Sequence, residues 1–484
     1  MAKGAAWMMT MRLFNRSVGF ISTLILARLL VPEDFGLIAM AMVFSSLLVA
    51  ISDMSVHVPL IQKSVIDDAD LNSAWSLQVM LSLAQSVVLT LAASWVAEFY
   101  GEPRLESIVY ALALITLVGG LQNTGVIMFQ RDMQFHKEFV FLSIVRILTF
   151  VVTISIAFWL RSYIALLSGM LVGAASRVIL SFVMHNHRPR WCVEKFLEFF
   201  HFSKWMLLNN ILKFLGQRGV ELVIGKTMGA RSVGLFSIGS EIATLPTTEL
   251  AAPINRVSLS GYSRLQGDEN ALKQSYLDVL GLIALVVLPT GIGIAISADR
   301  LVPLLLGENW IATIPLIEVL AVVGSVSCLL SNSGSVFLAK GKPRLLAFIS
   351  LIRILALIPA MIYLSSVYGL VGVAFAMMLA TAVWVALILT LLMRELSMHL
   401  QELVAVILRP VIAVISMAAM VRFAGINVQV SNLWIDTALT ISVGALTYSL
   451  CIVLLWFISR RPLGAETRLA ELCASSLRWP LISR

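Results

Sequence analysis

Long apolar stretches recur along this chain of 484 residues and constrain its fold more than any motif. An α-helix needs roughly 20 apolar residues to cross a bilayer, and about fourteen stretches meet that requirement. They are 7–30, 37–60, 71–96, 107–129, 139–160, 163–184, 202–225, 233–256, 276–298, 311–337, 344–366, 369–393, 402–423 and 433–458. We therefore expect an all-α, polytopic membrane protein.

The composition agrees with this class. Hydrophobic residues make up 59% of the chain and charged residues only 13%, a balance that soluble globular proteins do not have. The net charge of +8 comes from scattered basic residues, so no nucleic acid is expected as a partner. The four cysteines show no paired spacing, which argues against a disulfide framework and a zinc site.

The pattern of the chain occurs twice. RLLVPEDFGLIAMA begins at Arg28 and KTMGARSVGLFSIG at Lys226, and in each a cation is followed eight residues later by Gly-Leu. SIVRIL from Ser143 is echoed by SLIRIL from Ser350. The two offsets are about 198 and 207 residues, and internal duplication in a membrane protein is typical of transporters built from related halves.

The repeat predicts how the chain is organised. We expect an N-lobe over 1–185, a C-lobe over 202–395, two extra helices over 396–459 and a basic tail over 460–484. The linker 186–201 is predicted as an amphipathic helix at the inner interface, because Val193, Phe196, Leu197 and Phe200 share one helical face. An irregular basic linker is the alternative. Lys and Arg concentrate in connections that place both termini in the cytoplasm.

Enzyme motifs are missing from the sequence. It contains no G-x-S-x-G, no Walker loop, no H-E-x-x-H and no paired C-x-x-C. We therefore expect no enzyme, no cofactor and no metal site, and transport driven by an ion gradient or by the gradient of the substrate itself.

Cations inside the first apolar stretch are the first candidate site. Arg12 and Arg16 are four residues apart and project from one helical face, with Asn15 adjacent. Charged residues at the middle of a membrane span are costly and usually face a cavity. Arg16 is therefore predicted to line a substrate cavity, with a structural ion pair as the alternative.

The seventh stretch is the repeat counterpart of the first. Asn210, Lys213 and Gln217 follow one helical stripe, and the repeat offset places Lys213 level with Asn15, beside Arg16. Two related helices are thus predicted to offer cations at the same depth. Arg146 and Arg353 occupy equivalent places in the fifth and eleventh stretches, where they either line the cavity or bond to carbonyls of a neighbouring helix.

Two acid-containing pairs are candidates for gating or ion coupling. Arg218 and Glu221 are three residues apart, so they can form a gate or a structural pair, and Glu221 can instead carry a coupling proton. Asp53 and His57 are four residues apart, a spacing that suits proton coupling or a hydrated structural pair.

Several basic side chains spread over more than one helix suit a large anionic head group, such as a diphosphate with an attached sugar chain. Arginine contacts phosphate through two parallel hydrogen bonds, which gives geometry as well as attraction.

Four segments carry a resemblance to a known family. ARLLVPEDFGLIAMA, the D-x-x-x-H-x-P-L-I-Q stretch from Asp53 to Gln62, FQRDMQF from Phe129 and LLGENW from Leu305 resemble Wzx-type polysaccharide flippases. These belong to the multidrug/oligosaccharidyl-lipid/polysaccharide exporter superfamily, and the likeness is to its colanic-acid exporter branch. The sequence departs from that branch at 54–56, where a glycine-containing pattern is usual, and at Glu221, where an aspartate is usual.

The resemblance implies a bacterial inner-membrane protein with two pseudo-symmetric six-helix lobes around a central cationic cleft. It implies transport of an undecaprenyl-diphosphate-linked oligosaccharide for exopolysaccharide, capsule or O-antigen assembly, with membrane lipids, a polysaccharide polymerase and export machinery as partners. An ion-coupled drug/cation antiporter of the same superfamily is one alternative. A membrane glycan polymerase or ligase is the other.

Overall fold

The computed structural model describes residues 2–52, 66–194, 204–265, 267–427 and 432–459. Within these residues every regular element is a helix, as the apolar stretches predict. The chain divides into two compact units, Met1–Ser237 and Ile238–Arg484. The boundary between these units falls inside one long helix. The sequence instead predicts two lobes joined at 186–201, and this division into lobes remains a prediction.

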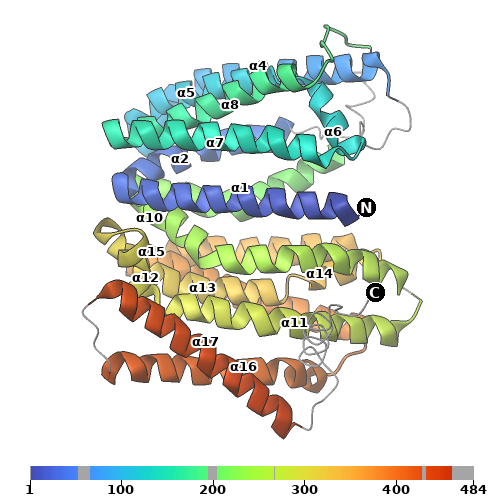
Figure 1. Ribbon diagram of the computed structural model, residues 1–484, viewed down its shortest axis with the longest axis vertical. Coiled ribbons are helices and arrows are strands. Elements are labelled where there is room, and N and C mark those ends of the chain that lie inside the picture. Colours follow the sequence, from blue (N-terminus) through green and yellow to red (C-terminus); the bar gives the residue numbers. More distant parts are fainter. Residues whose placement is uncertain (1, 53–65, 195–203, 266, 428–431, 460–484) are drawn as a thin grey trace, which may run out of the picture. The chain divides into compact units, whose positions relative to one another are not determined.

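The N-terminal unit is built from helices, most of them long (Figure 1). Its elements are α1 (Ala2–Leu29), α2 (Pro32–Ser52), α4 (Asp68–Tyr100), α5 (Arg104–Gly120), η1 (Thr124–Ile127), α6 (Met128–Arg131), α7 (Phe135–Leu160), α8 (Ile164–Met184) and the first part of α10 (Lys204–Arg264). Helix α1 packs against α7 and α7 against α8, while α5 contacts both α4 and α8.

A buried carboxylate joins the starts of two of these helices. Oδ2 of Asp34, in the VPEDFG segment, accepts a hydrogen bond of 3.2 Å from the backbone N–H of Val31, and Oδ1 accepts one of 3.1 Å from that of Tyr163. Asp34 is buried, so these bonds replace the water that the carboxylate loses on folding. The segment thereby ties α2 to the beginning of α8.

Helices α2 and α10 cross with their backbones in contact. A Cβ atom added to Gly36 would collide with the carbonyl oxygen of Ala230, and one added to Gly234 would collide with that of Pro32. Small residues permit such close helix approaches in membranes. Gly36 and Gly234, like Pro32 and Ala230, are separated by the repeat offset of about 198 residues. Residues related by the duplication therefore meet each other in this unit.

Helices α10 and α15 each contain two helical segments separated at a glycine. Gly229 has φ 77° and ψ 179°, and Gly369 has φ 58° and ψ −139°. Glycine adopts positive φ without the steric cost that a Cβ atom brings. The predicted stretches 202–225 and 233–256 lie on the two sides of Gly229. The predicted stretches 344–366 and 369–393 meet at Gly369.

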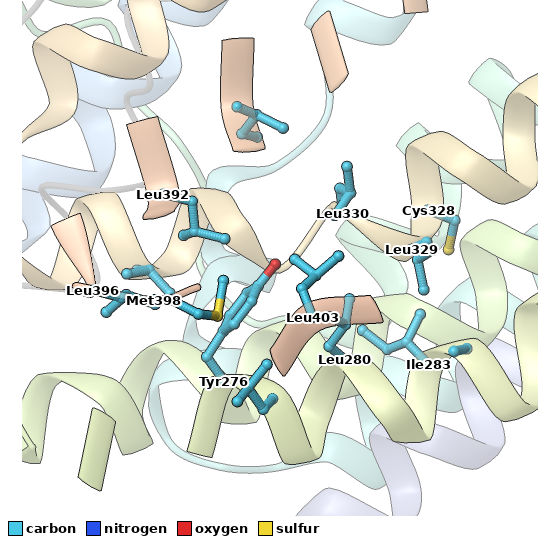
Figure 2. Packing of buried hydrophobic residues seen from close by; sticks show 14 of the residues in the cluster. Tyr276, Leu280, Ile283, Cys328, Leu329, Leu330, Leu392, Leu396, Met398 and Leu403 are labelled. Atoms are coloured by element: carbon cyan, nitrogen blue, oxygen red, sulfur yellow. The ribbon is translucent and has the colours of Figure 1, made fainter. Parts of the chain in front are cut away.

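The C-terminal unit contains the second part of α10 and the remaining helices (Figure 1). These are α11 (Glu269–Ile296), α12 (Ala298–Leu305), η2 (Glu308–Thr313), α13 (Ile314–Leu329), α14 (Ser333–Ala339), α15 (Pro343–Glu395), α16 (Leu400–Asn427) and α17 (Leu433–Ile458). Figure 2 shows its core, where Tyr276 and Leu280 of α11 lie beside Leu403 of α16. The Tyr276 hydroxyl is 2.9 Å from Oγ of Ser333, so this buried ring keeps a polar partner.

The two last helices pack onto the rest of this unit. Lys273 of α11 pairs with Glu402 of α16 at 2.6 Å, and Arg300 of α12 pairs with Asp436 of α17 at 2.7 Å. The hydroxyl of Tyr448 donates to the carbonyl oxygen of Leu285 at 2.8 Å. The extra helical pair predicted over 402–423 and 433–458 is thus present as α16 and α17.

Nine helices of the described residues are long and apolar enough to cross a membrane, or ten if the bent pair of α5 with η1 and α6 forms one span. The protein is therefore an all-helical, polytopic membrane protein. Helices α1 and α10 are not among the nine, and α15 counts once despite its break. Fourteen crossings remain a prediction, although each of the fourteen predicted stretches overlaps helix in the described residues, and 107–129 and 311–337 each cover more than one helix.

The connection after α8 is extended and bonded to the N-terminal unit. The side-chain amide of Asn123 donates to the carbonyl oxygen of His187 at 2.7 Å, and the backbone N–H of Cys192 donates to Oγ of Ser76 at 2.9 Å. Residues 185–193 contain no helix, so this part of the linker follows the irregular alternative. Phe196, Leu197 and Phe200 lie outside the described residues, where the amphipathic helix stays a prediction.

This connection is expected to loosen in acid. Burial lowers the pKa of His187 below its ordinary value, and the charge of Arg188 also lowers it. The nearby Asp68 carboxylate raises this pKa but does not offset the effect of burial. Burial also lowers the pKa of His185, and the charges of His187, Lys137 and Arg188 add to that effect while Asp132 opposes it. The detached segment therefore binds protons that the packed segment does not, and packing weakens as pH falls below about 6.5.

Hydrogen exchange of residues 185–192, corrected for intrinsic rates, should rise between about pH 7 and pH 5. His187→Gln should flatten the pH dependence, whereas His399→Gln, at an exposed site in the other unit, should leave it unchanged. Exchange that is independent of pH would contradict the expectation.

Candidate functional site

Helix α1 presents a cationic face. Arg12, Arg16 and Gly19 follow each other at spacings of four and three residues, so they lie along one side of the helix. The side chain of Arg16 is exposed and that of Arg12 is half-buried. Asn15 is turned to its own helix, since its side-chain amide donates to the carbonyl oxygen of Met11 at 2.9 Å. One of its two amide N–H donors is therefore used within α1.

A third cation joins this face from another helix. The guanidinium of Arg146, on α7, occupies the space above Gly19, where any side chain would collide with it. Gly19 lies one turn beyond Arg16 on α1. Arg12, Arg16 and Arg146 form what we call the cationic stripe of the N-terminal unit. The sequence singled out all three residues, but not the contact that brings Arg146 to α1.

The predicted polar stripe of the seventh stretch lies on α10. Asn210, Lys213 and Gln217 occupy one side of this helix by their spacing. The side chains of Lys213 and Gln217 lie outside the described residues, so their position beside Arg16 remains a prediction. The side-chain nitrogen of Asn210 is buried and has no hydrogen-bond partner in the described part of the chain. A donor in that state is available to a ligand.

Arg218 and Glu221 form an ion pair on α10. Nη1 of Arg218 lies 2.8 Å from Oε2 and 3.0 Å from Oε1 of Glu221, and the side chain of Glu221 is only 10% exposed against 35% for Arg218. One turn further on, the ring of Tyr100 packs over Gly225, and its hydroxyl is buried without a hydrogen-bond partner among the described residues. The pairing that the spacing allows is thus present, and its role as gate or support remains a prediction.

Removing one partner of this ion pair should cost more than removing the other. Arg218→Met leaves a buried carboxylate unpaired, so the free energy of unfolding should fall by about 2 kcal/mol, less than the ~3–5 kcal/mol of a fully buried pair because Arg218 is partly exposed. Glu221→Gln leaves the more exposed partner unpaired and should cost about half as much. Thermal unfolding of both variants and the double variant measures the coupling.

A transport assay on the same variants separates the two roles. A gate predicts that Glu221→Gln changes transport more than its small loss of stability can explain, whereas a structural pair predicts that both change together. Equal destabilisation by the two single substitutions would contradict the asymmetry.

The remaining predicted site residues are Arg353, Asp53 and His57. Arg353 lies on α15 in the C-terminal unit, where its guanidinium carbon is 5.5 Å from the ring centroid of Trp384 and Nη2 is 3.4 Å from Oγ1 of Thr381. Asp53 and His57 lie outside the described residues, so their predicted coupling role stays open to experiment. No cluster of three or more metal-ligating side chains occurs within the described ranges.

Comparisons with known proteins extend over most of the chain. The sequence profile of a family described as "Polysaccharide biosynthesis protein" matches residues 25–315. The lipopolysaccharide biosynthesis protein WzxC of Escherichia coli K12 is 24% identical over 383 residues, which cover 78% of this chain and 77% of WzxC. The succinoglycan biosynthesis transport protein ExoT of Rhizobium meliloti is 22% identical over 459 residues, 93% of this chain and 92% of ExoT.

Two solved structures share the fold. The lipid II flippase MurJ in an inward closed conformation aligns with a TM-score of 0.75 at 16% identity, over 93% of this chain and 99% of MurJ. An inward-facing multidrug resistance transporter of the MATE family aligns with a TM-score of 0.57 at 12% identity, over 79% of this chain and 95% of that transporter. At these identities the likeness describes the helical architecture alone.

Proposed function

Because this chain belongs to the polysaccharide biosynthesis protein family, the Wzx-like transporters of the MOP superfamily, we propose that it moves an undecaprenyl-diphosphate-linked oligosaccharide across the bacterial inner membrane. The protein is a transporter of polysaccharide biosynthesis and not an enzyme. The proposal adds the lipid-linked substrate, the direction from the inner to the outer leaflet, and the assembly of exopolysaccharide, capsule or O-antigen that follows. A polysaccharide polymerase and export machinery are then the partners that take over the product.

The cationic stripe of the N-terminal unit carries this proposal. Arg12 and Arg16 lie on one face of α1, and Arg146 meets the same helix one turn further on. Three guanidinium groups supply more positive charge than one small anion requires. A diphosphate has several oxygens at short spacing, and each guanidinium can hold two of them. The stripe therefore supports a diphosphate-bearing head group.

The physical task of the stripe is to replace water around the substrate. A phosphate that enters a membrane loses hydration, and the loss is tolerable only where fixed opposite charges and donors replace it. Arg16 and Arg146 supply the charge, Asn210 supplies an N–H donor without a partner among the described residues, and Lys213 is proposed to add a cation from the repeat-related helix. The lipid tail remains in the bilayer during the step.

The transport cycle that we propose is alternating access of the two lobes around a central cleft. In this cycle we propose that both termini lie in the cytoplasm, which the distribution of Lys and Arg among the connections supports. The sequence has no ATP-binding motif, so proton or sodium exchange, or the flow of substrate itself, supplies the drive. Glu221 and the Asp53–His57 pair are the candidate proton carriers.

Of the two alternatives, one remains. A drug/cation antiporter would share the fold seen in the MATE transporter, but its site should offer acids to an organic cation, whereas the described site offers arginines. A glycan polymerase or ligase is ruled out by membership of a transporter family.

Deletion of the gene in the strain that encodes this protein tests the proposal. Surface polysaccharide should disappear, and an undecaprenyl-diphosphate-linked oligosaccharide should accumulate in the inner leaflet, where mass spectrometry of lipid extracts identifies it. A plasmid copy should restore both. Normal surface polysaccharide together with new sensitivity to organic cations would overturn the proposal in favour of the antiporter.

A further inference from the structure

The C-terminal unit contains a largely apolar cavity with a few polar groups on its wall. It has a volume of about 370 Å³ and lies between the second part of α10, α13 and α15. Most of the polar groups on its wall are small hydroxyl and amide side chains, joined by a single charged one. They include Ser240, Thr244, Asn255, Ser327, Ser331 and the charged Arg353. Cavities of about 300–1,000 Å³ with a few placed polar groups are typical of small-molecule sites.

Arg353 is the cation of this cavity, and it has no acidic partner among the described residues. No ion pair joins its guanidinium to a carboxylate in the described part of the chain. Its contacts are the 3.4 Å hydrogen bond to Thr381 and the approach to the face of Trp384. Both contacts hold the group in place without neutralising it. A half-buried guanidinium in that state is best satisfied by an anion that enters the cavity.

Two further polar atoms on the wall lack partners. Oγ of Ser327 and Oδ1 of Asn255 are buried without a hydrogen bond among the described residues. The amide nitrogen of Asn255 is already engaged, since it donates to Oγ of Ser331 at 2.8 Å. Oδ1 of Asn255 can only accept, so it requires a donor from the occupant. A simple anion would pair with Arg353 but would leave Oδ1 of Asn255 without a hydrogen-bond donor.

We propose that this cavity binds a sugar acid, with its carboxylate on Arg353 and a ring hydroxyl donating to Oδ1 of Asn255. A carboxylate matches the planar guanidinium through two parallel hydrogen bonds, and Ser327 completes the set as a donor to the carboxylate or to a ring oxygen. The cavity admits one sugar residue of this class. The proposal deepens the proposed function, because a sugar acid within the transported glycan is one source of the occupant and a free sugar acid is the other.

Binding of glucuronate to the purified full-length protein tests this site independently of transport. The probes are glucuronate, glucose, which has the hydroxyls without the charge, and acetate, which has the charge without the hydroxyls. We expect saturable quenching of Trp384 by glucuronate, read as the difference between the wild type and Trp384→Phe. Glucose should bind at least about tenfold more weakly, because it lacks the charged hydrogen bonds to Arg353. Acetate should also bind at least about tenfold more weakly, because it lacks the hydroxyl that donates to Asn255.

Substitutions identify the groups that bind. Arg353→Met should abolish glucuronate binding, Arg353→Lys should weaken it because the paired hydrogen bonds are lost, and Asn255→Ala should weaken it by about tenfold. Arg344→Met, at an exposed position in the first turn of the same helix, is the matched control and should bind like the wild type. If Arg353→Met does not fold, the preference of the wild type among the three probes still decides.

Three outcomes would overturn the proposal: equal binding of glucose and glucuronate, equal binding of acetate and glucuronate, or wild-type binding by Arg353→Met. The lipid-linked oligosaccharide that accumulates in the deletion strain separates the two sources. A uronic acid in that glycan assigns the site to the transported substrate, and its absence assigns the site to a free sugar acid. If the deletion strain keeps normal surface polysaccharide while the purified protein still binds glucuronate, the proposed function is rejected and the site is retained.

Discussion

Replacing Arg16 by alanine should reduce export of the lipid-linked glycan by at least about tenfold. A hydrogen bond to a charged group contributes ~1.5–3 kcal/mol, and ~1.4 kcal/mol corresponds to a factor of ten. The variant should still reach the membrane, because Arg16 lies in the middle of the predicted span 7–30, and removing a charge from the middle of a span eases insertion by about 2.5–3.5 kcal/mol on translocon scales. Surface polysaccharide in the complemented deletion strain measures the loss, and membrane fractions measure the amount of protein.

Arg28→Ala is the matched control, since Arg28 is an exposed arginine near the end of the same helix. It should export like the wild type. Lys213→Ala should reproduce the loss of Arg16→Ala if the two repeat-related helices act on one head group. Normal export by Arg16→Ala would remove the cationic stripe from the mechanism.

Replacing Gly234 by valine should prevent accumulation of folded protein. Its side chain would have to enter the space held by the carbonyl oxygen of Pro32, and a backbone carbonyl cannot rotate away as a side chain can. Overpacking of a core by a few methyl groups typically costs about 1–3 kcal/mol, and a backbone collision exceeds that range. Size-exclusion chromatography of detergent extracts should show aggregate in place of the monodisperse peak.

Gly119→Val provides the comparison, because a Cβ atom at Gly119 in α5 meets nothing within 4 Å. This variant should fold. The milder Gly36→Ala and Gly234→Ala act on one shared crossing, so their effects on the unfolding temperature should not add. A monodisperse Gly234→Val protein would show that α2 and α10 can separate without loss of the fold.

Much of the helical architecture follows from sequence because each segment carries its own signal. Apolar length marks the helices, and the repeat marks Gly36 and Gly234 as equivalent positions, which the structure then places in contact. The break of α10 at Gly229 agrees with two predicted stretches. The bonds of 185–193 to Asn123 and Ser76 are tertiary, so no local pattern could separate that segment from an amphipathic helix.

The candidate site is predictable only in part for the same reason. Arg12, Arg16 and Arg146 are visible as costly charges in apolar stretches, but the approach of α7 to α1 at Gly19 depends on packing. Most of the wall of the cavity in the C-terminal unit has no distinctive pattern in the sequence, because Ser240, Thr244 and Ser327 are ordinary residues in membrane helices. Two signals were present: the charge of Arg353 in an apolar stretch, and the run of Ser240, Thr244 and Thr247 on one side of α10.

The reversal at Gly369 has a practical consequence for mapping the topology of this protein. A Cβ atom at Gly372 would strike the carbonyl oxygen of Leu364, so the chain doubles back there with no spare loop between the two parts of α15. A reporter tag inserted at this point would separate the two parts of α15, so its reading would not report the topology of the native protein.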